Sequence, residues 1–459
     1  MTRIEKDSLG EVSIPENKLW GSQTQRSLMF FNIGSETLPW GLISALIKIK
    51  KAASVVNAEL DLIDSNIAIL IQKACDQLLE EKSLEHFPVR IWQTGSGTQS
   101  NMNVNEVIAN LANTYAGNKP GTKKPVHPND HVNRAQSSND VFPSAMHIFA
   151  KQLIDQQLIP VTGKMLIQLT ALEEQWTSTF ICGRTHMMDA LPLTLAQIVS
   201  GYRYQFEQAE SALRTASEDL NNIALGGTAV GTGANAPENF GERVCEQLNQ
   251  LYDMSLQSHA NKFAALSSQD EINRCAQAVN LIAVVLQKMA NDIRLLASGP
   301  NSAIGELKLP ENEPGSSIMP GKVNPTQCEA LTMICIQVTT NCQAILLAIS
   351  QGQLQLNTYR PLIIRNFAES VTLLAEGMNS FTQHCLCGLT VDNARVQEHL
   401  DKNLMLITVA TPLIGYDNAS KIARHALLEK TDIYTAAEAL KIISAEELHR
   451  YIAEKLRHR

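Results

Sequence analysis

The chain has 459 residues, of which 44% are hydrophobic and 18% charged, a composition typical of a globular protein with more than one domain. Aromatic residues make up only 5%, and this shortage favours helices, because aromatic side chains suit the pleated surface of a sheet. The net charge of −8 argues against a nucleic-acid partner, which would need a clustered basic surface. We also expect neither a membrane span nor a signal peptide, since no apolar run approaches about 18 residues.

The nine cysteines are spread along the chain without any CxxC pair. An odd number of dispersed cysteines in a large chain predicts reduced thiols and a cytoplasmic protein. Three of them, Cys328, Cys335 and Cys342, repeat every seven residues, which predicts a buried helix seam. The sequence has neither a cluster of metal ligands nor the cysteine spacing of an iron–sulfur centre, so we expect no metal and no other cofactor.

In chain order, the first 138 residues predict an irregular first domain. A helical stretch spans about 42–79. It is followed by a Gly/Ser/Asn-rich segment at 93–105 and by a segment punctuated with Pro and Gly at 117–130.

Long helices dominate the predicted central domain, residues 139–392. Its clearest signal is a set of apolar residues spaced alternately by three and four positions, which places one stripe on a helix of about 25 residues. The stripe consists of Ile272, Cys275, Val279, Ile282, Leu286, Met289, Ile293 and Leu296. The same spacing runs through 335–349, and a break at 388–392 precedes a small helical C-terminal domain, residues 393–459.

Residues beside this stripe are also apolar, namely Leu281, Val284 and Val285. A helix that is apolar on several sides must be covered on several sides, which in a soluble protein predicts helices shared between subunits. We therefore expect a mainly α protein whose central bundle forms the core of a homo-oligomer.

Four polar islands rich in Ser, Thr, Asn and Gly interrupt the predicted helices, at 94–103, 137–140, 183–186 and 315–324. Short hydroxyl and amide side chains and exposed backbone N–H groups are donors that hold a carboxylate, especially where a helix begins. Two plainer interpretations stay open. The Ser-Ser-Asn-Asp island is also typical of a helix N-cap, and the Thr-Gly-Ser-Gly-Thr island is equally typical of a turn.

The fourth island is a loop hinged by Pro-Gly pairs at 314–315 and 320–321. It carries two hydroxyls, Ser316 and Ser317, with Lys322 a few residues on. Serine is too weak an acid to ionise near neutral pH, but a nearby ammonium and backbone N–H groups would lower its pKa. The pattern alone fits both a surface hinge with a solvated lysine and a loop that holds a basic serine.

Taken together and in this order, the motifs resemble those of the fumarase/aspartase superfamily. The stretch at 315–329, Gly-Ser-Ser-Ile-Met-Pro-Gly-Lys-Val-Asn-Pro-Thr-Gln-Cys-Glu, is similar to the signature of its class II fumarases. The other matching motifs lie at 95–103, 127–130, 137–140, 183–186, 226–233 and 311–315. The resemblance implies the three-domain fold of that family, with residues 1–138 as its N-terminal lyase domain. It also implies a homotetramer with a helical core, whose active sites draw residues from three subunits.

The resemblance further implies reversible anti hydration of fumarate to (S)-malate through an aci-carboxylate, which preorganised donors would stabilise. Ser316 would take the C3 proton, stabilised by Lys322, while His186 would act on the hydroxyl side and Glu329 would orient and polarise it. The residues implied to bind substrate are Ser96, Gly97, Thr98, Ser137, Ser138, Asn139, Thr185, Ser317, Lys322, Val323 and Asn324.

A second, non-catalytic anion site is implied for the motif His127, Pro128, Asn129 and Asp130. A simple polar turn explains the same four residues equally well, so both interpretations stay open here.

The nearest alternative is an aspartate ammonia-lyase, which runs the analogous elimination on the same fold. Those enzymes typically carry Gln in place of His186 and Ala in place of Gly321, so both residues favour water as the group eliminated. Fumarases usually have Glu at Gln355 and Arg at Asn301, and Gln355 looks more like the ammonia-lyase version. A catalytically inactive structural relative, such as a lens crystallin, is a second alternative, and the presence of Ser316 with its implied partners argues against it.

Overall fold

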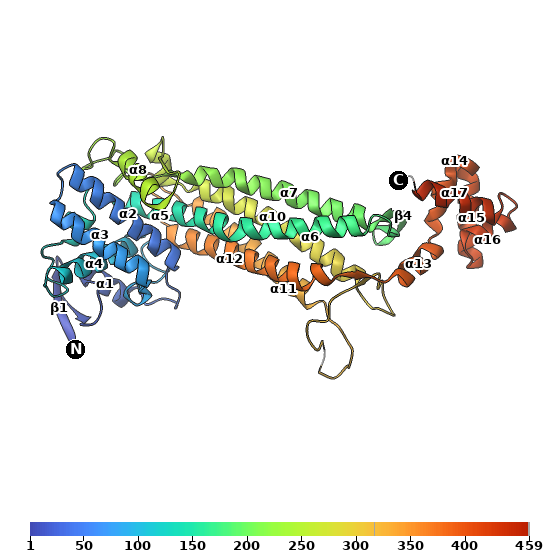
Figure 1. Cartoon of the computed structure of the whole chain (residues 1–459), viewed down its shortest axis with the longest axis horizontal. Helices are drawn as coiled ribbons and strands as arrows, with labels where there is room; N and C mark the ends of the chain where they lie inside the picture. The colour runs from blue at the N-terminus through green and yellow to red at the C-terminus, as the bar shows by residue number, and fades with distance from the viewer. Residues whose placement is uncertain (316, 458–459) are drawn as a thin grey trace. The chain divides into compact units, whose positions relative to one another are not determined.

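The fold is described from a computed structural model of the chain, which covers residues 1–315 and 317–457. Most of these residues lie in α-helices, and strands occur only in short two-stranded pairs (Figure 1). The prediction of a mainly α fold is confirmed.

The chain divides into two compact units. Unit 1 consists of Met1–Pro160, Ala209–Val284 and Ile334–Ala375, and unit 2 consists of Val161–Gln208, Val285–Met333 and Glu376–Arg459. The predicted domain boundaries after residues 138 and 392 stay a prediction.

The helices that belong to unit 1 are α1 (Ser22–Phe30), α2 (Trp40–Glu59), α3 (Ser65–Glu81), α4 (Thr98–Tyr115), α5 (Ser138–Leu153), α8 (Phe240–Tyr252) and α9 (Lys262–Ser267). Its short 3₁₀ and π turns are η1 (Leu84–His86), η2 (Pro128–Val132), η3 (Ile154–Leu158) and η4 (Asp219–Asn221). Five helices have residues in both units, namely α6 (Ile159–Gln175), α7 (Leu195–Glu218), α10 (Asp270–Leu296), α11 (Thr326–Ile349) and α12 (Arg360–His384). The rest of unit 2 holds η5 (Leu386–Gly388), α13 (Asn393–Lys402), η6 (Leu404–Ala410), α14 (Thr411–Ile414), α15 (Tyr416–Glu429), α16 (Ile433–Ala439) and α17 (Ala445–Arg457).

Four pairs of strands complete the described fold. Three are antiparallel, namely β1 (Thr2–Asp7) with β2 (Gly10–Pro15), β3 (Phe180–Thr185) with β4 (Met188–Thr194), and β7 (Leu307–Lys308) with β8 (Thr390–Val391). The fourth, β5 (Asn222–Ile223) with β6 (Gln257–Ser258), is parallel.

The predicted apolar stripe lies on α10, where all of its residues are buried except Leu296, which is half-buried. The predicted cysteine seam is likewise buried on α11, and in unit 1 Cys342 Sγ lies 3.1 Å from the carbonyl oxygen of Ala276 on α10. The residues beside the stripe behave differently. Leu281 and Val284 are exposed in the single chain, whereas Val285 is buried, so only one of the three finds cover within the chain.

The predicted helical stretch at 42–79 is two helices, α2 and α3, and not one. Asp61 takes a left-handed φ of 54° just after α2, and Asp64 then caps α3 by accepting a hydrogen bond from the backbone N–H of Asn66. An aspartate at each of these positions suits a turn, because a short polar side chain tolerates left-handed backbone and supplies a cap.

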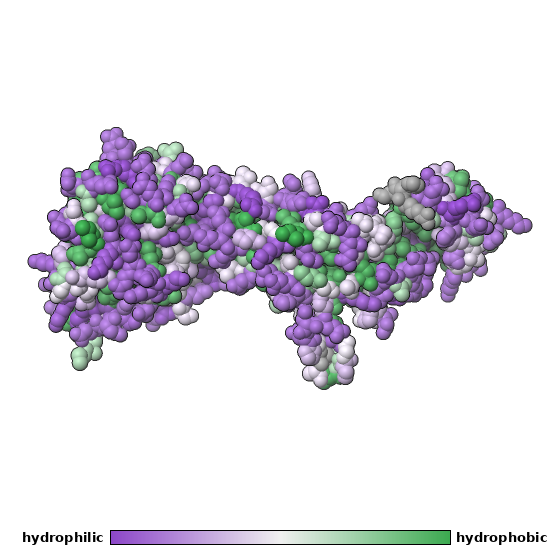
Figure 2. All heavy atoms as spheres, in the orientation of Figure 1, coloured by the Kyte–Doolittle hydropathy of each residue, from purple (hydrophilic) through white to green (hydrophobic). Residues whose placement is uncertain are grey.

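One described helix, α11, is long and apolar enough to cross a membrane by length and composition alone, a test that the core helix of a soluble protein also passes. One side of it, with Cys335 and Val338, is buried inside the protein, while Met333, Ile336 and Leu347 are exposed. Figure 2 shows green, hydrophobic spheres in several places among the purple, hydrophilic ones on the face that it presents. This pattern fits a helix that packs in a bundle and keeps an uncovered apolar edge.

Candidate active site

Two of the polar islands meet in unit 1, where α4 and α5 begin. Ser96 Oγ lies 2.8 Å from Thr98 Oγ1, which in turn lies 2.7 Å from Ser138 Oγ. Thr98 and Ser138 are the first residues of their helices, so this hydroxyl cluster lies beside two helix N-termini. A helix N-terminus combines unpaired N–H groups with partial positive charge, and hydroxyls add further donors. The hydroxyl cluster is therefore suited to a carboxylate.

Two glycines allow the first island to take this shape. Gly97 has a φ of +79°, and a Cβ at this position would lie 2.4 Å from the ring of Phe142. A Cβ at Gly95 would lie only 1.3 Å from the carbonyl oxygen of Thr358. Since real Cβ contacts do not come closer than about 3 Å, a side chain at either position would force the backbone leading into α4 to move.

Ser137 and Asp140 cap α5 reciprocally. Ser137 Oγ accepts a hydrogen bond from the backbone N–H of Asn139 at 3.2 Å, and Asp140 Oδ1 accepts one from the backbone N–H of Ser137 at 3.0 Å. The N-cap interpretation of this island is therefore correct. It does not exclude a binding role, because Ser138 Oγ contacts Thr98, and Asn139 Nδ2 donates to the carbonyl oxygen of Ala229 at 2.8 Å.

Asp140 also fastens the glycine-rich motif at 226–233 to α5. Its Oδ2 accepts hydrogen bonds from the backbone N–H groups of Gly226 at 3.1 Å and Thr228 at 2.9 Å, and the side chain is fully buried. Burial raises the pKa of the Asp140 carboxyl, against the lowering effect of these bonds.

Two buried cations balance this carboxylate. Burial lowers the pKa of Lys50 to about 7 and that of Arg360 to about 9, and the negative charge of Asp140 opposes the shift in both. The Lys50 ammonium donates to Asn133 Oδ1 at 2.8 Å and to Gln136 Oε1 at 3.0 Å. Neither cation belongs to a sequence motif, and Lys50 lies between Lys48 and Lys51 in α2, so the sequence does not distinguish it from a solvated lysine.

The proposed second anion motif forms the turn η2 in unit 1. The ring nitrogen Nδ1 of His127 accepts hydrogen bonds from the backbone N–H groups of Asn129 at 3.2 Å and Asp130 at 3.1 Å. Pro128 is buried, while Asn129 and Asp130 are exposed. These residues therefore form a turn capped by His127, and an anion bound here would compete with His127 for the same two N–H groups; the second anion site stays a prediction.

The third island forms the tip of the β3–β4 hairpin in unit 2. Thr185 pairs with Met188, which leaves His186 and Met187 as a two-residue turn. Both turn residues have left-handed backbones, with φ of 54° and 64°, a conformation that suits this turn but strains side chains other than glycine, asparagine or aspartate. Thr185 and His186 are exposed in the single chain.

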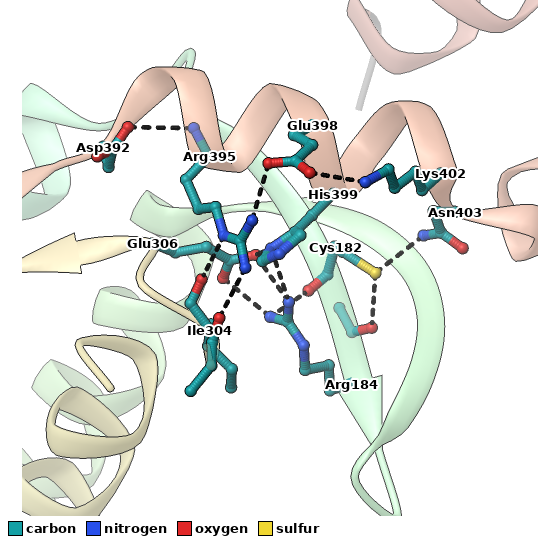
Figure 3. Close-up of polar contacts among 12 residues, drawn as sticks. Cys182, Arg184, Ile304, Glu306, Asp392, Arg395, Glu398, His399, Lys402 and Asn403 are labelled. Carbon is teal, nitrogen blue, oxygen red and sulfur yellow. Dashed lines mark hydrogen bonds and ion pairs between the residues drawn. The ribbon is translucent and has the colours of Figure 1, made fainter. Parts of the chain in front are cut away.

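Below the tip, the hairpin is held by charged contacts in unit 2. Arg184 donates two hydrogen bonds to the buried carboxylate of Glu306, at 2.7 and 2.9 Å (Figure 3). This pairing raises the pKa of Arg184. Sequence reasoning did not single out Glu306, because it lies outside the motif that starts at 311.

The fourth island is a loop of unit 2 that ends at α11. The residue predicted to be the base, Ser316, lies outside the described residues. The side-chain amide of Asn324 donates to the carbonyl oxygen of Gly315 and closes the base of the loop. Other predicted residues, Ser317, Lys322, Val323 and Glu329, are exposed, and Glu329 lies in the first turn of α11.

The predicted site residues therefore fall into two groups within the described chain. The hydroxyl cluster, Ser137 and Asn139 come together in unit 1. In unit 2, no contact among the described residues joins Thr185 or His186 to Lys322 or Glu329. The two departures from the fumarase pattern, Asn301 and Gln355, are exposed.

Metal ligands do not gather in the described part of the chain, where no three His, Cys, Asp or Glu side chains are placed to hold an ion. All nine cysteines are free thiols, and only Cys387 is exposed. The absence of a metal or other cofactor stays a prediction.

Known proteins resemble this chain along its full length. Residues 10–340 match a family model described as lyase, and residues 406–455 match one described as fumarase C C-terminus. A class II fumarate hydratase of Pseudomonas putida is 49% identical over 98% of this chain and 97% of its own, and one of Thermosynechococcus vestitus is 47% identical over 99% and 97%.

Solved structures agree with these relatives. The crystal structure of a class II fumarase from Schistosoma mansoni has a TM-score of 0.96 at 38% identity and covers 100% of both chains. A fumarate lyase:delta crystallin from Brucella melitensis has a TM-score of 0.95 at 35% identity, covering 100% of this chain and 99% of that one. With its two groups of site residues on this fold, the chain belongs to the class II fumarate hydratase family of lyases.

Proposed function

We propose that this chain is a fumarate hydratase that catalyses the reversible anti addition of water to fumarate, giving (S)-malate as in the tricarboxylic acid cycle. The observation that carries the proposal is the hydroxyl cluster of Ser96, Thr98 and Ser138 at two helix N-termini, in a chain of this family. Fumarate offers an enzyme only two carboxylates and a double bond between them. Its recognition therefore depends on groups of donors that hold carboxylates.

The reaction is limited by the weak acidity of the malate C3 proton, whose removal leaves a dianionic aci-carboxylate. Donors fixed around that carboxylate, from the hydroxyl cluster with Gly97, Ser137 and Asn139, stabilise it more than the substrate. Removal of one such donor costs about 10²–10³ in kcat in enzymes that stabilise an oxyanion. The family resemblance assigns further contacts to Thr185, Ser317, Lys322, Val323 and Asn324.

The proton transfers are assigned to Ser316, His186 and Glu329. Ser316 takes the C3 proton, with Lys322 and the loop backbone stabilising its alkoxide. His186, oriented by Glu329, protonates the leaving hydroxide or activates the attacking water. These roles rest on the family motifs, since Ser316 lies outside the described residues.

A homotetramer completes the active sites in this proposal. His186 and Glu329 are exposed in the single chain, although a proton transfer to the substrate needs a site that excludes bulk water. The exposed apolar residues Leu281 and Val284 of α10 and Met333 of α11 would be covered by neighbouring subunits. We further propose a cytoplasmic location, because all the cysteines are free thiols. We also propose a second anion site at His127 and its neighbours.

The decisive experiment follows the ultraviolet absorbance of fumarate after malate is added to the purified protein. The absorbance should rise when malate is added, because fumarate forms. When fumarate is added alone, the absorbance should fall until fumarate and malate reach equilibrium. The same assay with aspartate tests the ammonia-lyase alternative, and a chelator should leave the rate unchanged. Turnover of aspartate without turnover of malate would overturn the proposal.

Substitution Ser316→Ala tests the assigned base. The serine hydroxyl is replaced by a methyl group that cannot take a proton, so malate dehydration should fall by about 10³-fold or more while the circular dichroism spectrum stays the same. Substitution Ser317→Ala is the matched control, because it removes the neighbouring hydroxyl and should cost less. A larger loss in S317A than in S316A would assign the base to the other serine.

A further inference from the structure

The hairpin that carries Thr185 and His186 has an unfavourable tip. Two-residue turns of this shape favour Asn-Gly, because both central residues need positive φ, yet here they are His186 and Met187. A left-handed residue other than glycine is strained and persists only where the surrounding structure holds it. The strands behind the tip must therefore be fixed by contacts outside the hairpin.

The strongest such contact is the pairing of Arg184 with Glu306. The Glu306 side chain is 0% exposed, and both of its oxygens accept from the two terminal nitrogens of Arg184 (Figure 3). A bidentate pair fixes orientation as well as distance, because the planar guanidinium matches the carboxylate in only one plane. Arg184 Nη1 also donates to the carbonyl oxygen of Cys182 at 3.1 Å, within the strand irregularity between Cys182 and Arg184. The pairing thus sets the course of β3 immediately before Thr185.

Helix α13 contributes a second donor to the same carboxylate. His399 Nδ1 lies 2.7 Å from Glu306 Oε1, which makes its Nδ1–H a donor to a buried oxygen. Arg395 donates to the carbonyl oxygens of Ile304 at 3.1 Å and Ala303 at 2.8 Å, and so holds the segment leading to Glu306. Because both residues lie on one helix, α13 and the segment 303–306 form one support for Arg184.

The other strand of the hairpin is tied to the end of α13. The side-chain amide of Asn403 donates to the carbonyl oxygen of Ala190 at 2.8 Å and lies 3.1 Å from Cys182 Sγ. Asn403 is buried. Both strands behind the tip are therefore attached to the same support, one by Arg184 and one by Ala190.

We infer that Glu306 is a positioning residue for the proposed reaction. Glu306 holds His186 in place through Arg184, and His399 and α13 hold Glu306 in turn. The inference rests on the proposed function of His186. Glu306 itself touches neither the substrate nor the reacting atoms. Its carboxylate acts by fixing the strand that ends in Thr185 and His186, so its loss should weaken proton transfer more than substrate binding.

The test is a double-mutant cycle of Glu306→Gln and His186→Asn in the full-length protein, with malate as substrate. Asparagine suits the left-handed position of His186 and keeps the turn. E306Q retains the shape of the side chain but offers only one acceptor oxygen to Arg184 and His399. We expect E306Q to lower kcat about 10- to 100-fold with a change in KM below about 3-fold, since a misplacement of about 1 Å has effects of this size. In the H186N background, E306Q should lower kcat by less than about 2-fold, because residues acting through one another are not additive.

The matched control is Glu173→Gln. Glu173 accepts from Arg203 Nε at 2.6 Å in the same unit and belongs to α6, not to the hairpin or its support. E173Q should change kcat by less than about 2-fold, as is usual for a partly exposed ion pair. Equal losses in E173Q and E306Q would overturn the inference.

Two outcomes separate the inference from the function on which it rests. A wild-type protein that does not dehydrate malate would overturn the proposed function. Equal loss of kcat from E306Q in the wild-type and H186N backgrounds would overturn only the positioning role, since a general weakening of the fold multiplies with any other defect. If E306Q does not fold, Arg184→Lys replaces it in the cycle, because lysine keeps the charge and loses the bidentate geometry. Wild-type kcat in R184K would then overturn the inference.

Discussion

Asp140 offers the sharpest stability prediction, because one buried carboxylate joins two segments beside the hydroxyl cluster. It accepts three backbone N–H groups, from Ser137, Gly226 and Thr228, and is fully buried. In Asp140→Asn, the amide keeps one oxygen and turns its NH₂ group toward a backbone donor. The substitution therefore removes at least one hydrogen bond to a charged acceptor and leaves a buried N–H group without a partner.

The expected magnitude follows from these contacts. A hydrogen bond to a charged group contributes about 1.5–3 kcal/mol, and an unsatisfied buried N–H group costs about 1–3 kcal/mol. Neutralising the carboxylate returns part of its desolvation cost, which is the reason that burial raises its pKa, but it also leaves Lys50 and Arg360 without their buried counter-charge. The net loss in free energy of unfolding should be about 2–4 kcal/mol.

Urea unfolding followed by circular dichroism measures this loss, with all variants at one subunit concentration because assembly shifts the midpoint. Asp64→Asn is the matched control in the same unit. Asp64 caps α3 through one bond, to Asn66, on the surface, and asparagine caps a helix nearly as well as aspartate, so the change should be below about 0.5 kcal/mol. A D140N protein as stable as D64N would refute the role given to the buried carboxylate.

Two further predictions concern the start of α4 and the effect of acid. Gly97→Ala places a Cβ 2.4 Å from the Phe142 ring and should raise KM for malate by about 10-fold or more. The control Gly117→Ala has a similar φ of +78° but no atom within 4 Å of the new Cβ, so KM should stay unchanged. Equal effects of the two substitutions on KM would show that the contact with Phe142 is irrelevant. Burial lowers the pKa of His147, so the unfolded chain binds its proton first and the melting temperature should fall as the pH drops below about 6.5. The variant His147→Asn keeps a donor toward the carbonyl oxygen of Asn222, and its melting temperature should fall less steeply between pH 7.5 and 5.5 than that of the wild type. The melting temperature of His449→Asn, a variant of an exposed histidine, should follow that of the wild type.

The helices, and the segments of the site that lie where α4 and α5 begin, could be predicted because each has a local signal in the sequence. The stripe on α10 repeats with the period of a helix, so it identifies one buried face without knowledge of its partners. The islands before α4 and α5 carry glycine or capping residues whose backbone preferences act within four residues. The same reasoning merged α2 and α3, because the break near Asp61 consists of a left-handed aspartate without Gly or Pro.

The buried charges could not be predicted, because their partners are distant in sequence and, for Asp140, are backbone groups. Asp140 binds backbone N–H groups 86 and 88 residues away, and Arg184 meets Glu306 across 122 residues. Backbone groups are the same in every residue, so neither spacing nor composition marks them as partners. A lysine among other lysines, such as Lys50, or a single glutamate, such as Glu306, is typical of a solvated surface in a sequence, and only its burial shows that it is paired.

Asp140 in unit 1 and Glu306 in unit 2 have the same structural role, because each fixes the backbone beside predicted site residues. A side chain that binds substrate must keep its donors available, so its own contacts hold it weakly. In each unit the fixed carboxylate lies next to the site and not within it: Asp140 follows Asn139, and Glu306 holds the residue before Thr185. Each carboxylate accepts from two chain segments at once and is closed to solvent, which makes its geometry stiff and nearly insensitive to salt. Substitutions at these two carboxylates should therefore change catalysis although neither carboxylate contacts the substrate. The effect of a substitution at Glu306 should depend on the presence of His186, and the effect of one at Asp140 should depend on the hydroxyl cluster.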